Sequence, residues 1–414
     1  MIGRIDFVGS CYAEFLVYFF KDSFLLKRAN TPITVFIAKK PNGGSLMKDY
    51  TGKTIFVGMD VHKKTYSVTV ICDSCIIKRD TLKAEPEDLI SYLKKRFGSG
   101  KIKTAYEAGF CGFHLHRTLE AAGIENIVVH AAGIETSNSR VKTDKRDSLK
   151  IAVHLSEGKL RSVYIPTVEQ EDHRTVTRLR DTFCKERARI GNQIKSLLFL
   201  HGLIPADNKK KASQKWIESL SRFEMPPGVK FAIEKFVAMW LEFNEKIKEI
   251  DLEIKKQAIK DQAVDAIYQT ASGIGPTSAR VLANELGNLQ QFKNERQLFS
   301  YIGFTPSEHS SGEHTRQGHI TKQGKPIVRK ILVQAAWVAI RHDIELQNIY
   351  EKIAVKSGAK RAIVAVARRL IGRIRACFRT GELYEAKKVE RPTLKFKKLP
   401  KTKIQSTLKH KLVA

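Results

Sequence analysis

The sequence predicts a mixed α/β domain followed by a largely all-α region. Short apolar runs alternate with helical stretches from Ile55 to about Glu157, as is typical of an α/β domain. From about Val168 to Ile267 the pattern becomes that of long helices, and a glycine turn near Thr270 opens a third, mainly helical region. A chain of 414 residues is also too long for one compact core. We therefore expect several domains.

The strands and helices of the α/β domain follow one another in a defined order. The continuous apolar run IFVGM (55–59) predicts a central buried strand, and YSVTVI (66–71) and CIIKRD (75–80) predict two more strands in an antiparallel meander. Next come a helix over 86–97, the strand KTAYE (103–107), a helix over 113–122 and the strand NIVVH (126–130). This order is that of an RNase H-like core.

The cysteines give no sign of a zinc site or a disulfide framework. Cys72 and Cys75 form a CxxC, but no second CxxC or suitably spaced His pair follows, so we predict a turn between two strands. The six cysteines lie at scattered positions, which indicates reduced thiols of a cytosolic protein.

The second region is predicted to be a helical hairpin with a coiled-coil seam. Apolar residues have near-heptad spacing in the first arm: Val176, Leu179, Phe183, Ile190 and Leu197. In the return arm they alternate spacings of four and three: Phe236, Trp240, Phe243, Ile247, Ile250 and Ile254. The pair either packs on its own domain or is completed by another subunit.

The third region opens with SGIGPTSARVLANELG (272–287), a glycine turn followed by an amphipathic helix. This resembles a helix-hairpin-helix, in which Gly273 and Gly275 would present backbone N–H groups to a phosphate without reading base sequence. The alternative is a plain helix-turn-helix packing element. Beyond Tyr384 the chain is rich in lysine and poor in apolar residues, which predicts a flexible phosphate-binding tail.

These patterns divide the chain into five segments. The first is taken as a non-core extension, because its apolar stretch from Tyr12 to Phe20 is much shorter than a membrane span, and Met47 is the expected natural start. The expected segments are an extension (1–46), an RNase H-like catalytic domain (47–165), a helical coiled-coil region (166–268), a C-terminal domain (269–383) and a basic tail (384–414).

The charge indicates a nucleic-acid partner. Lysine and arginine number 73 against 43 acidic residues, a formal charge of +30 that creates a strong field for polyanions. An anionic membrane surface is the rival reading, but the basic residues are spread along folded segments and do not gather beside an apolar anchor.

Four acidic residues form a candidate metal site. Asp60 ends the first apolar strand and Glu107 ends the strand after the first helix, so parallel pairing would place the two acids side by side. Asp144 and Asp147 stand three residues apart at the start of a helix, on one face and at its positive end. Four converging carboxylates suit Mg²⁺ or Mn²⁺. Taken singly, each acid also fits a turn, a strand end or a helix cap.

Basic and histidine residues accompany these acids. Lys142, Lys145 and Arg146 interleave with the last two acids, where they either hold substrate phosphates or form a solvated helix start. His62, His114 and His116 lie near the acids, and we interpret them as structural or substrate-facing, because histidine ligands would favour zinc.

At this point the sequence resembles a known family. GMDVHKKT, YEAG and KTDKRDS, followed by SGIGPTSA and YIGFTPSEHSSGEHTRQGHITKQGKPIVRKIL, look like bacterial insertion-sequence transposases with a RuvC-like DEDD domain and a C-terminal transposase domain that carries a catalytic serine. The resemblance covers nearly everything from about Met47 to Thr380. It implies that the acids are Asp60, Glu107, Asp144 and Asp147, and that the serine is Ser310, with Ser311 as the adjacent alternative.

The resemblance implies a mechanism and partners as well. The serine would attack a scissile phosphate and hold it transiently while metal at the acids assists. The protein would act in the bacterial cytoplasm, at the nucleoid, as a homo-oligomer (dimer or tetramer) guided by a structured RNA from the element. No membrane partner is expected.

The residues around the serine point to phosphate binding without the family's help. The serine lies in what looks like a Gly-rich loop, accompanied by Arg316, Lys322, Lys325 and Arg329. No adjacent base is obvious, so activation of the hydroxyl must come from elsewhere.

Two other functions fit parts of the pattern. A Holliday-junction resolvase or another metal-dependent nuclease acting through water would use the same acids, but would not need the serine-bearing domain. A proofreading-type exonuclease would need D-x-E where Asp60 is followed by Val61 and His62. A non-catalytic nucleic-acid-binding protein would leave the acids as caps.

Overall fold

The computed structural model describes residues 48–130, 144–205, 212–311 and 314–386. The chain separates into two compact units, one up to Ile165 and one from Pro166. The predicted extension 1–46, the start at Met47 and most of the predicted tail lie outside the described residues. Within the described ranges, every helix is too short or too polar to span a membrane.

The N-terminal unit is built on a mixed five-stranded sheet. Its strands are β1 (Thr54–Val61), β2 (Thr65–Cys72), β3 (Cys75–Lys83), β4 (Lys101–Glu107) and β5 (Glu125–Val129). Their order across the sheet is β3-β2-β1-β4-β5. The first three strands pair antiparallel, whereas β4 pairs parallel with both β1 and β5. This confirms the predicted meander and the alternation that follows it, and is compatible with an RNase H-like domain.

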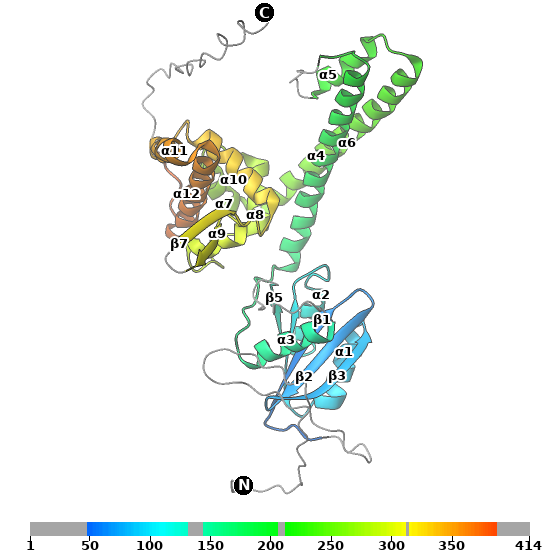
Figure 1. Ribbon diagram of the computed structural model, residues 1–414, viewed down its shortest axis with the longest axis vertical. Coiled ribbons are helices and arrows are strands. Elements are labelled where there is room, and N and C mark those ends of the chain that lie inside the picture. Colours follow the sequence, from blue (N-terminus) through cyan, green and yellow to red (C-terminus); the bar gives the residue numbers. More distant parts are fainter. Residues whose placement is uncertain (1–47, 131–143, 206–211, 312–313, 387–414) are drawn as a thin grey trace, which may run out of the picture. The chain divides into compact units, whose positions relative to one another are not determined.

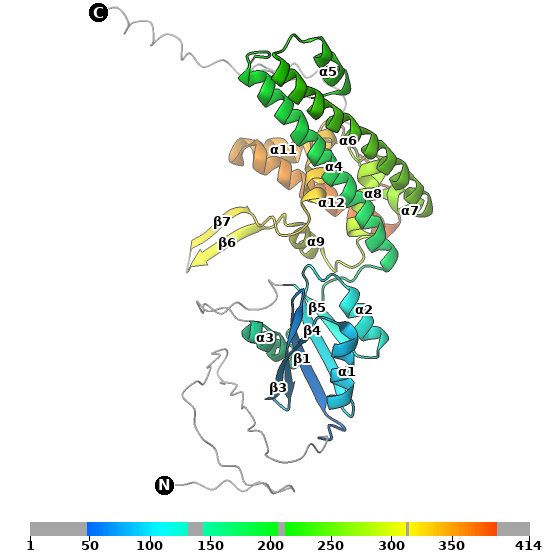
Figure 2. The ribbon, with the colours of Figure 1, turned by 90° about the vertical axis from the view of Figure 1, so that its right-hand side faces the viewer.

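Helices cover both faces of this sheet. Helices α1 (Pro86–Phe97) and α2 (His114–Ala121) lie on one side, and α3 (Asp144–Ser156) lies on the other (Figure 2). The side of α1 and α2 holds the larger core, including Ile55, Val57, Met59 and Tyr106. The side of α3 holds smaller clusters around Phe56 and Ala152. Alternate residues of β1 therefore face different helices.

The CxxC segment forms the tight turn between β2 and β3. Cys72 pairs directly with Cys75, and the two residues between them, Asp73 and Ser74, have φ of 49° and 63°. Positive φ at both central residues is the geometry of a two-residue hairpin turn. Both thiols are free, so the predicted turn is confirmed.

The second unit begins with two long helices, α4 (Val168–Leu200) and α6 (Pro227–Lys260), which run side by side (Figure 1). The helices are antiparallel: Arg180 contacts Asp251, whereas Arg187, seven residues further along α4, stacks on Trp240, which lies before Asp251 in α6. At their connection, α5 (Gln214–Ser219) and η2 (Leu220–Arg222) complete a small apolar core.

The predicted seam holds for part of this pair. Ile190, Trp240, Ile247 and Ile254 are buried, but Leu179 is 43% exposed, so its place in the seam is wrong. The reason is local: near Leu179 the buried residues of α4 are Arg174 and Thr177, and Arg174 bonds to helix α8 instead of α6.

The rest of the second unit is a helical body with one β-hairpin. Its core gathers the apolar faces of all its helices except the long pair. The elements are α7 (Gln262–Thr270), α8 (Pro276–Leu286), α9 (Glu295–Ile302), β6 (Pro306–Ser311), β7 (His314–Ile320), α10 (Pro326–Ala339), α11 (Ile344–Ser357) and α12 (Ala359–Thr380). The hairpin β6–β7 extends away from the helices (Figure 2).

Candidate functional site

Asp60 and Glu107 lie at neighbouring strand ends on one face of the sheet. Their preceding residues, Met59 and Tyr106, are register partners in the parallel pair β1–β4. Met59 and Tyr106 are buried on the side of α1 and α2, so strand alternation turns the two acids to the face crossed by α3. The side chain of Asp60 is half-buried and Glu107 is exposed. Both acids are therefore positioned by the backbone at one edge of the sheet.

Helix α3 reaches this edge because Gly58 leaves room for it. A Cβ at Gly58 would overlap the backbone nitrogen of Ala152 and the carbonyl oxygen of Ser148. Ser148 is tied to β2 by a 2.9 Å hydrogen bond between its Oγ and Thr69 Oγ1, which is buried. Asp147, the residue before Ser148, is consequently held close to the end of β1. Asp144 begins α3, and its side chain lies outside the described residues.

The donor set fits a hard divalent cation. Carboxylates from two strands and one helix are the ligands that Mg²⁺ and Mn²⁺ prefer. No group of three or more His, Cys, Asp or Glu side chains suited to a metal is gathered among the residues whose side chains are described, a set that lacks Asp144. Asp147 instead faces Lys150, with Nζ 3.5 Å from Oδ1.

His62 is the close neighbour of these acids that the sequence did not single out as a partner. Its Nε2 lies 3.3 Å from Asp60 Oδ2. The signal was available: residues two apart in a strand point to the same face, so Asp60 and His62 share one. His116 has another role, since its Nδ1 lies 2.9 Å from Asn126 Nδ2 in a network that includes Thr104.

The basic residues predicted beside the acids are only partly described. Lys142 lies outside the described residues, and so does the side chain of Lys145. Arg146 is half-buried in the first turn of α3.

The serine segment is a β-hairpin and not the loop that the glycines suggested. Ser310 pairs with Thr315 and Ser311 with His314, which places both serines at the tip of β6–β7. Lys322, Lys325 and Arg329 follow the other end of β7. A strand rises about 3.3 Å per residue, so Ser311 is about 17 Å from Pro306 at the hairpin base. Within the unit, the hairpin separates the serines from these three cations. Arg316 lies on β7 opposite His309.

Glycines and one arginine lock the base of this hairpin. Gly303 has φ of 79° and packs against the backbone of Gln323, and Gly324 has φ of 110° and packs against that of Tyr301. Arg329 Nη1 donates to the carbonyl oxygens of Ile302 and Gly324, at 2.8 and 3.1 Å. Arg329 therefore holds the hairpin base in place.

The glycine turn between α7 and α8 has two different glycines. Gly273 has φ of 92°, and a Cβ there would lie 2.8 Å from the carbonyl oxygen of Ala335, so this turn packs closely on α10. Gly275 precedes α8 and has open space around it. Of the two, Gly275 has the room that a phosphate contact requires.

A buried carboxylate draws several cations together beside α8. Glu285 is 1% exposed and accepts two hydrogen bonds from Arg178, at 2.7 and 2.9 Å. Arg174 donates to the backbone oxygens of Asn284 and Glu285. Partial burial lowers the pKa of Lys325, and the charge of Arg178 lowers it further. Positive charge is thus in excess where α4 meets the start of α10.

Another ion pair lies where α7 meets α8. Arg280, 2% exposed, donates to Asp261 at 2.9 Å, and its Nη2 lies 3.4 Å from Asp265 Oδ1. Burial raises the pKa of Asp265 to about 6 despite Arg280. The sequence gave no signal for this pair, because an arginine inside an amphipathic helix ordinarily faces water.

Comparison with known proteins agrees with these two units. Residues 57–201 match a family model for DEDD-type proteins of the IS110 group, described as "Transposase". Residues 265–351 match the model described as "Transposase IS116/IS110/IS902 family". The first match spans the sheet with Asp60, Glu107 and Asp147, and the second spans the glycine turn and the hairpin.

Curated relatives point the same way. A putative transposase of Sinorhizobium fredii is 32% identical over 57% of this chain and 65% of its own length. The transposase for insertion sequence element IS1111A of Coxiella burnetii is 27% identical over 61% of this chain and 71% of its own. The chain thus spans about two thirds of the length of these relatives. Matched at both of its characteristic regions and in the same order, the chain belongs to the IS110/IS116/IS902 family of bacterial insertion-sequence transposases.

Proposed function

We propose that this chain cleaves and exchanges DNA strands for an insertion sequence, with Asp60, Glu107, Asp144 and Asp147 as metal ligands and Ser310 as the nucleophile. The observation that carries the proposal is the register of β1 and β4. It sets Asp60 and Glu107 side by side on the face where α3 brings its first turn. Four acids from three elements would otherwise repel one another, and a cation relieves that repulsion.

The chemistry divides between the acids and the hydroxyl. A divalent cation held by the four carboxylates supplies charge stabilisation for a phosphodiester. Ser310 Oγ forms a bond to the phosphorus while the bond from phosphorus to one sugar oxygen breaks. The serine proton is lost, and the departing sugar oxygen gains one. Attack by the sugar hydroxyl of another strand then reverses these changes and releases the serine.

The partners follow from charge and family. The charge of +30 favours DNA and RNA alike. By resemblance we extend the proposal to a structured guide RNA and to a homo-oligomer in which both regions contribute to one reaction.

A covalent-adduct experiment tests the proposal. The purified chain is incubated with Mg²⁺, the element's DNA ends and the candidate RNA, and protein–DNA adducts are separated under denaturing conditions. We expect an adduct that disappears in Ser310→Ala and persists in Ser311→Ala. Cutting without an adduct would point instead to a resolvase or nuclease that uses water, and binding without cutting to a passive binder.

A matched pair of substitutions tests the acids. Asp60→Asn is expected to lower adduct formation by a hundredfold or more, while the affinity for DNA stays within about twofold, as for loss of a group used only in the transition state. Asp73→Asn is the control, because Asp73 lies in an exposed turn with φ of 49°, a conformation that asparagine accepts. Equal activity of both variants would refute the acidic site.

A further inference from the structure

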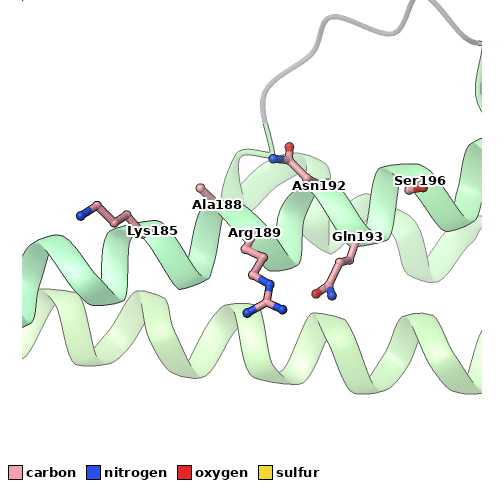
Figure 3. A pocket seen from close by; sticks show the side chains of 6 residues that line it. All are labelled: Lys185, Ala188, Arg189, Asn192, Gln193 and Ser196. Atoms are coloured by element: carbon pink, nitrogen blue, oxygen red, sulfur yellow. The ribbon is translucent and has the colours of Figure 1, made fainter. Parts of the chain in front are cut away.

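One face of α4 carries basic and amide side chains that the proposed chemistry leaves unused. A shallow concavity follows this face and is lined by Lys185, Ala188, Arg189, Asn192, Gln193 and Ser196 (Figure 3). All six residues are exposed. They recur at spacings of three and four, so they form one stripe along the helix.

The arginines of α4 divide between its two faces. Arg180 is paired with Asp251, and Arg187 lies over the ring of Trp240 at 5.4 Å, so both are directed to α6. Lys185 and Arg189 turn away from that contact and are 65% and 70% exposed. The inward arginines hold the helix pair together, which leaves the outward cations without a structural task in this unit.

The stripe continues to the start of α10. Lys330 reaches Asp181 on α4, with Nζ 3.5 Å from Oδ1, and Asp181 also contacts Lys185. Arg178, one turn earlier on α4, acts electrostatically on Lys325. We call the cations and amide Lys325, Arg178, Lys330, Lys185, Arg189 and Gln193 the α4 track.

The exposed charge of the α4 track is positive. Two carboxylates lie along it: Asp181, which is only 12% exposed, and Glu186, which is 3.5 Å from Arg189. Glu285 beside Arg178 is buried. Exposed ion pairs contribute little free energy, so a phosphate competes readily for Lys185 and Arg189.

We propose that the α4 track binds the sugar–phosphate backbone of duplex DNA. From Arg178 to Gln193 the helix rises about 22 Å, which matches about six base pairs of a duplex. Lysine, arginine and amide side chains are the groups that contact phosphates without reading sequence. Small side chains such as Ala188 and Ser196 let the backbone approach the helix. The track offers no aromatic ring for the stacking that single strands use.

This proposal rests on the proposed function and extends it. The α4 track begins at the N-terminus of α10, next to the base of the hairpin that bears Ser310. DNA held on the track would be the part of the substrate that flanks the hairpin. Contacts of this kind set the position of a duplex and add affinity that falls with salt.

The experiment measures the salt dependence of DNA affinity with the full chain. Duplex DNA of arbitrary sequence is titrated at several NaCl concentrations with the wild type, Lys185→Gln/Arg189→Gln and the control Lys246→Gln/Lys248→Gln. The control removes the same charge from exposed lysines of α6 that also pair with acids of their own helix. We expect the slope of log affinity against log salt to fall by about two for the first variant, at about 0.9 per lost phosphate contact, and to stay unchanged for the control.

A gain-of-charge variant gives an independent reading. Gln193→Lys is expected to steepen the slope by about one. An unchanged slope in both track variants would overturn the proposal, as would an equal fall in the control. A loss confined to duplex RNA would assign the stripe to RNA and overturn it as well.

The outcomes separate this proposal from the catalytic one. Asp60→Asn is expected to keep the full salt slope while losing the adduct. If the wild type forms no adduct but Lys185→Gln/Arg189→Gln still lowers the slope, the catalytic proposal fails and the α4 track stands.

Discussion

Gly58 is the residue where the sheet and α3 approach most closely. It lies on the same face as Asp60, two residues away, and has no room for a Cβ against the backbone of Ser148 and Ala152. Any side chain at this position must push α3 off β1, and Asp147 moves with the helix. One hydrogen atom in place of a methyl group thus sets the distance between two of the proposed ligands.

Gly58→Ala is expected to destabilise the N-terminal unit by about 1–3 kcal/mol, the usual cost of overpacking. Urea denaturation and hydrogen exchange of the α3 amides measure the effect. Gly228→Ala is the control, because a Cβ there meets nothing within 4 Å. Unchanged exchange in α3 of the Gly58 variant would mean that the helix does not depend on this contact.

Asp265 predicts a pH dependence of stability. Its folded pKa of about 6 lies above the ordinary value of 3.8, so the folded state binds its proton more tightly than the unfolded state. The stability gained from protonation is complete below the unfolded pKa and is lost as pH rises through about 6, by at most about 3 kcal/mol.

Comparison with Asp265→Asn isolates this contribution from other carboxylates. The variant is expected to gain stability relative to the wild type between pH 4 and pH 7, as measured by chemical denaturation at each pH. A difference between the two proteins that does not vary with pH would contradict the raised pKa.

At the scale of elements, strands were predictable and the serine hairpin was not. The run around Val57 is apolar and ends at Asp60, so the sequence alone located β1 and its acid. The segment around Ser310 is polar throughout, and its glycines suggested a loop. Its strands are stabilised instead by pairing with each other and by glycines at the base, Gly303 and Gly324, which no local apolar period reveals. Likewise, Leu179 fits the heptad spacing but lies where α4 packs on α8 through Arg174.

The hairpin base gives a prediction for this element. Gly324→Ala would force a Cβ into the carbonyl oxygen of Tyr301 at φ of 110°, so the hairpin should become more susceptible to proteolysis and adduct formation should fall at least tenfold. Gly318→Ala is the matched control, because its Cβ would meet the Ser307 hydroxyl, a side chain able to rotate away. Equal protease sensitivity in both variants would show that the base does not hold the hairpin.

For the whole molecule, the division into two units separates the proposed metal ligands from the serine. All four acids belong to the unit that ends at Ile165, and Ser310 belongs to the unit that begins at Pro166. The N-terminal unit has its own core, with Ile55, Val57, Met59 and Leu89 fully buried. A core of this kind stabilises a domain of its size without help from the rest of the chain.

The fragment 48–165 is therefore expected to fold alone and to bind Mn²⁺, but not to form the DNA adduct. Circular dichroism with a cooperative thermal transition tests folding, and calorimetric titration tests metal binding, with Asp60→Asn in the same fragment as the control. Because the ligands come from within this unit, its affinity for Mn²⁺ should match that of the full chain within a few fold, and Asp60→Asn should weaken it at least tenfold. A folded fragment that binds no metal, beside a full chain that does, would place a ligand in the second unit and break the proposed tetrad.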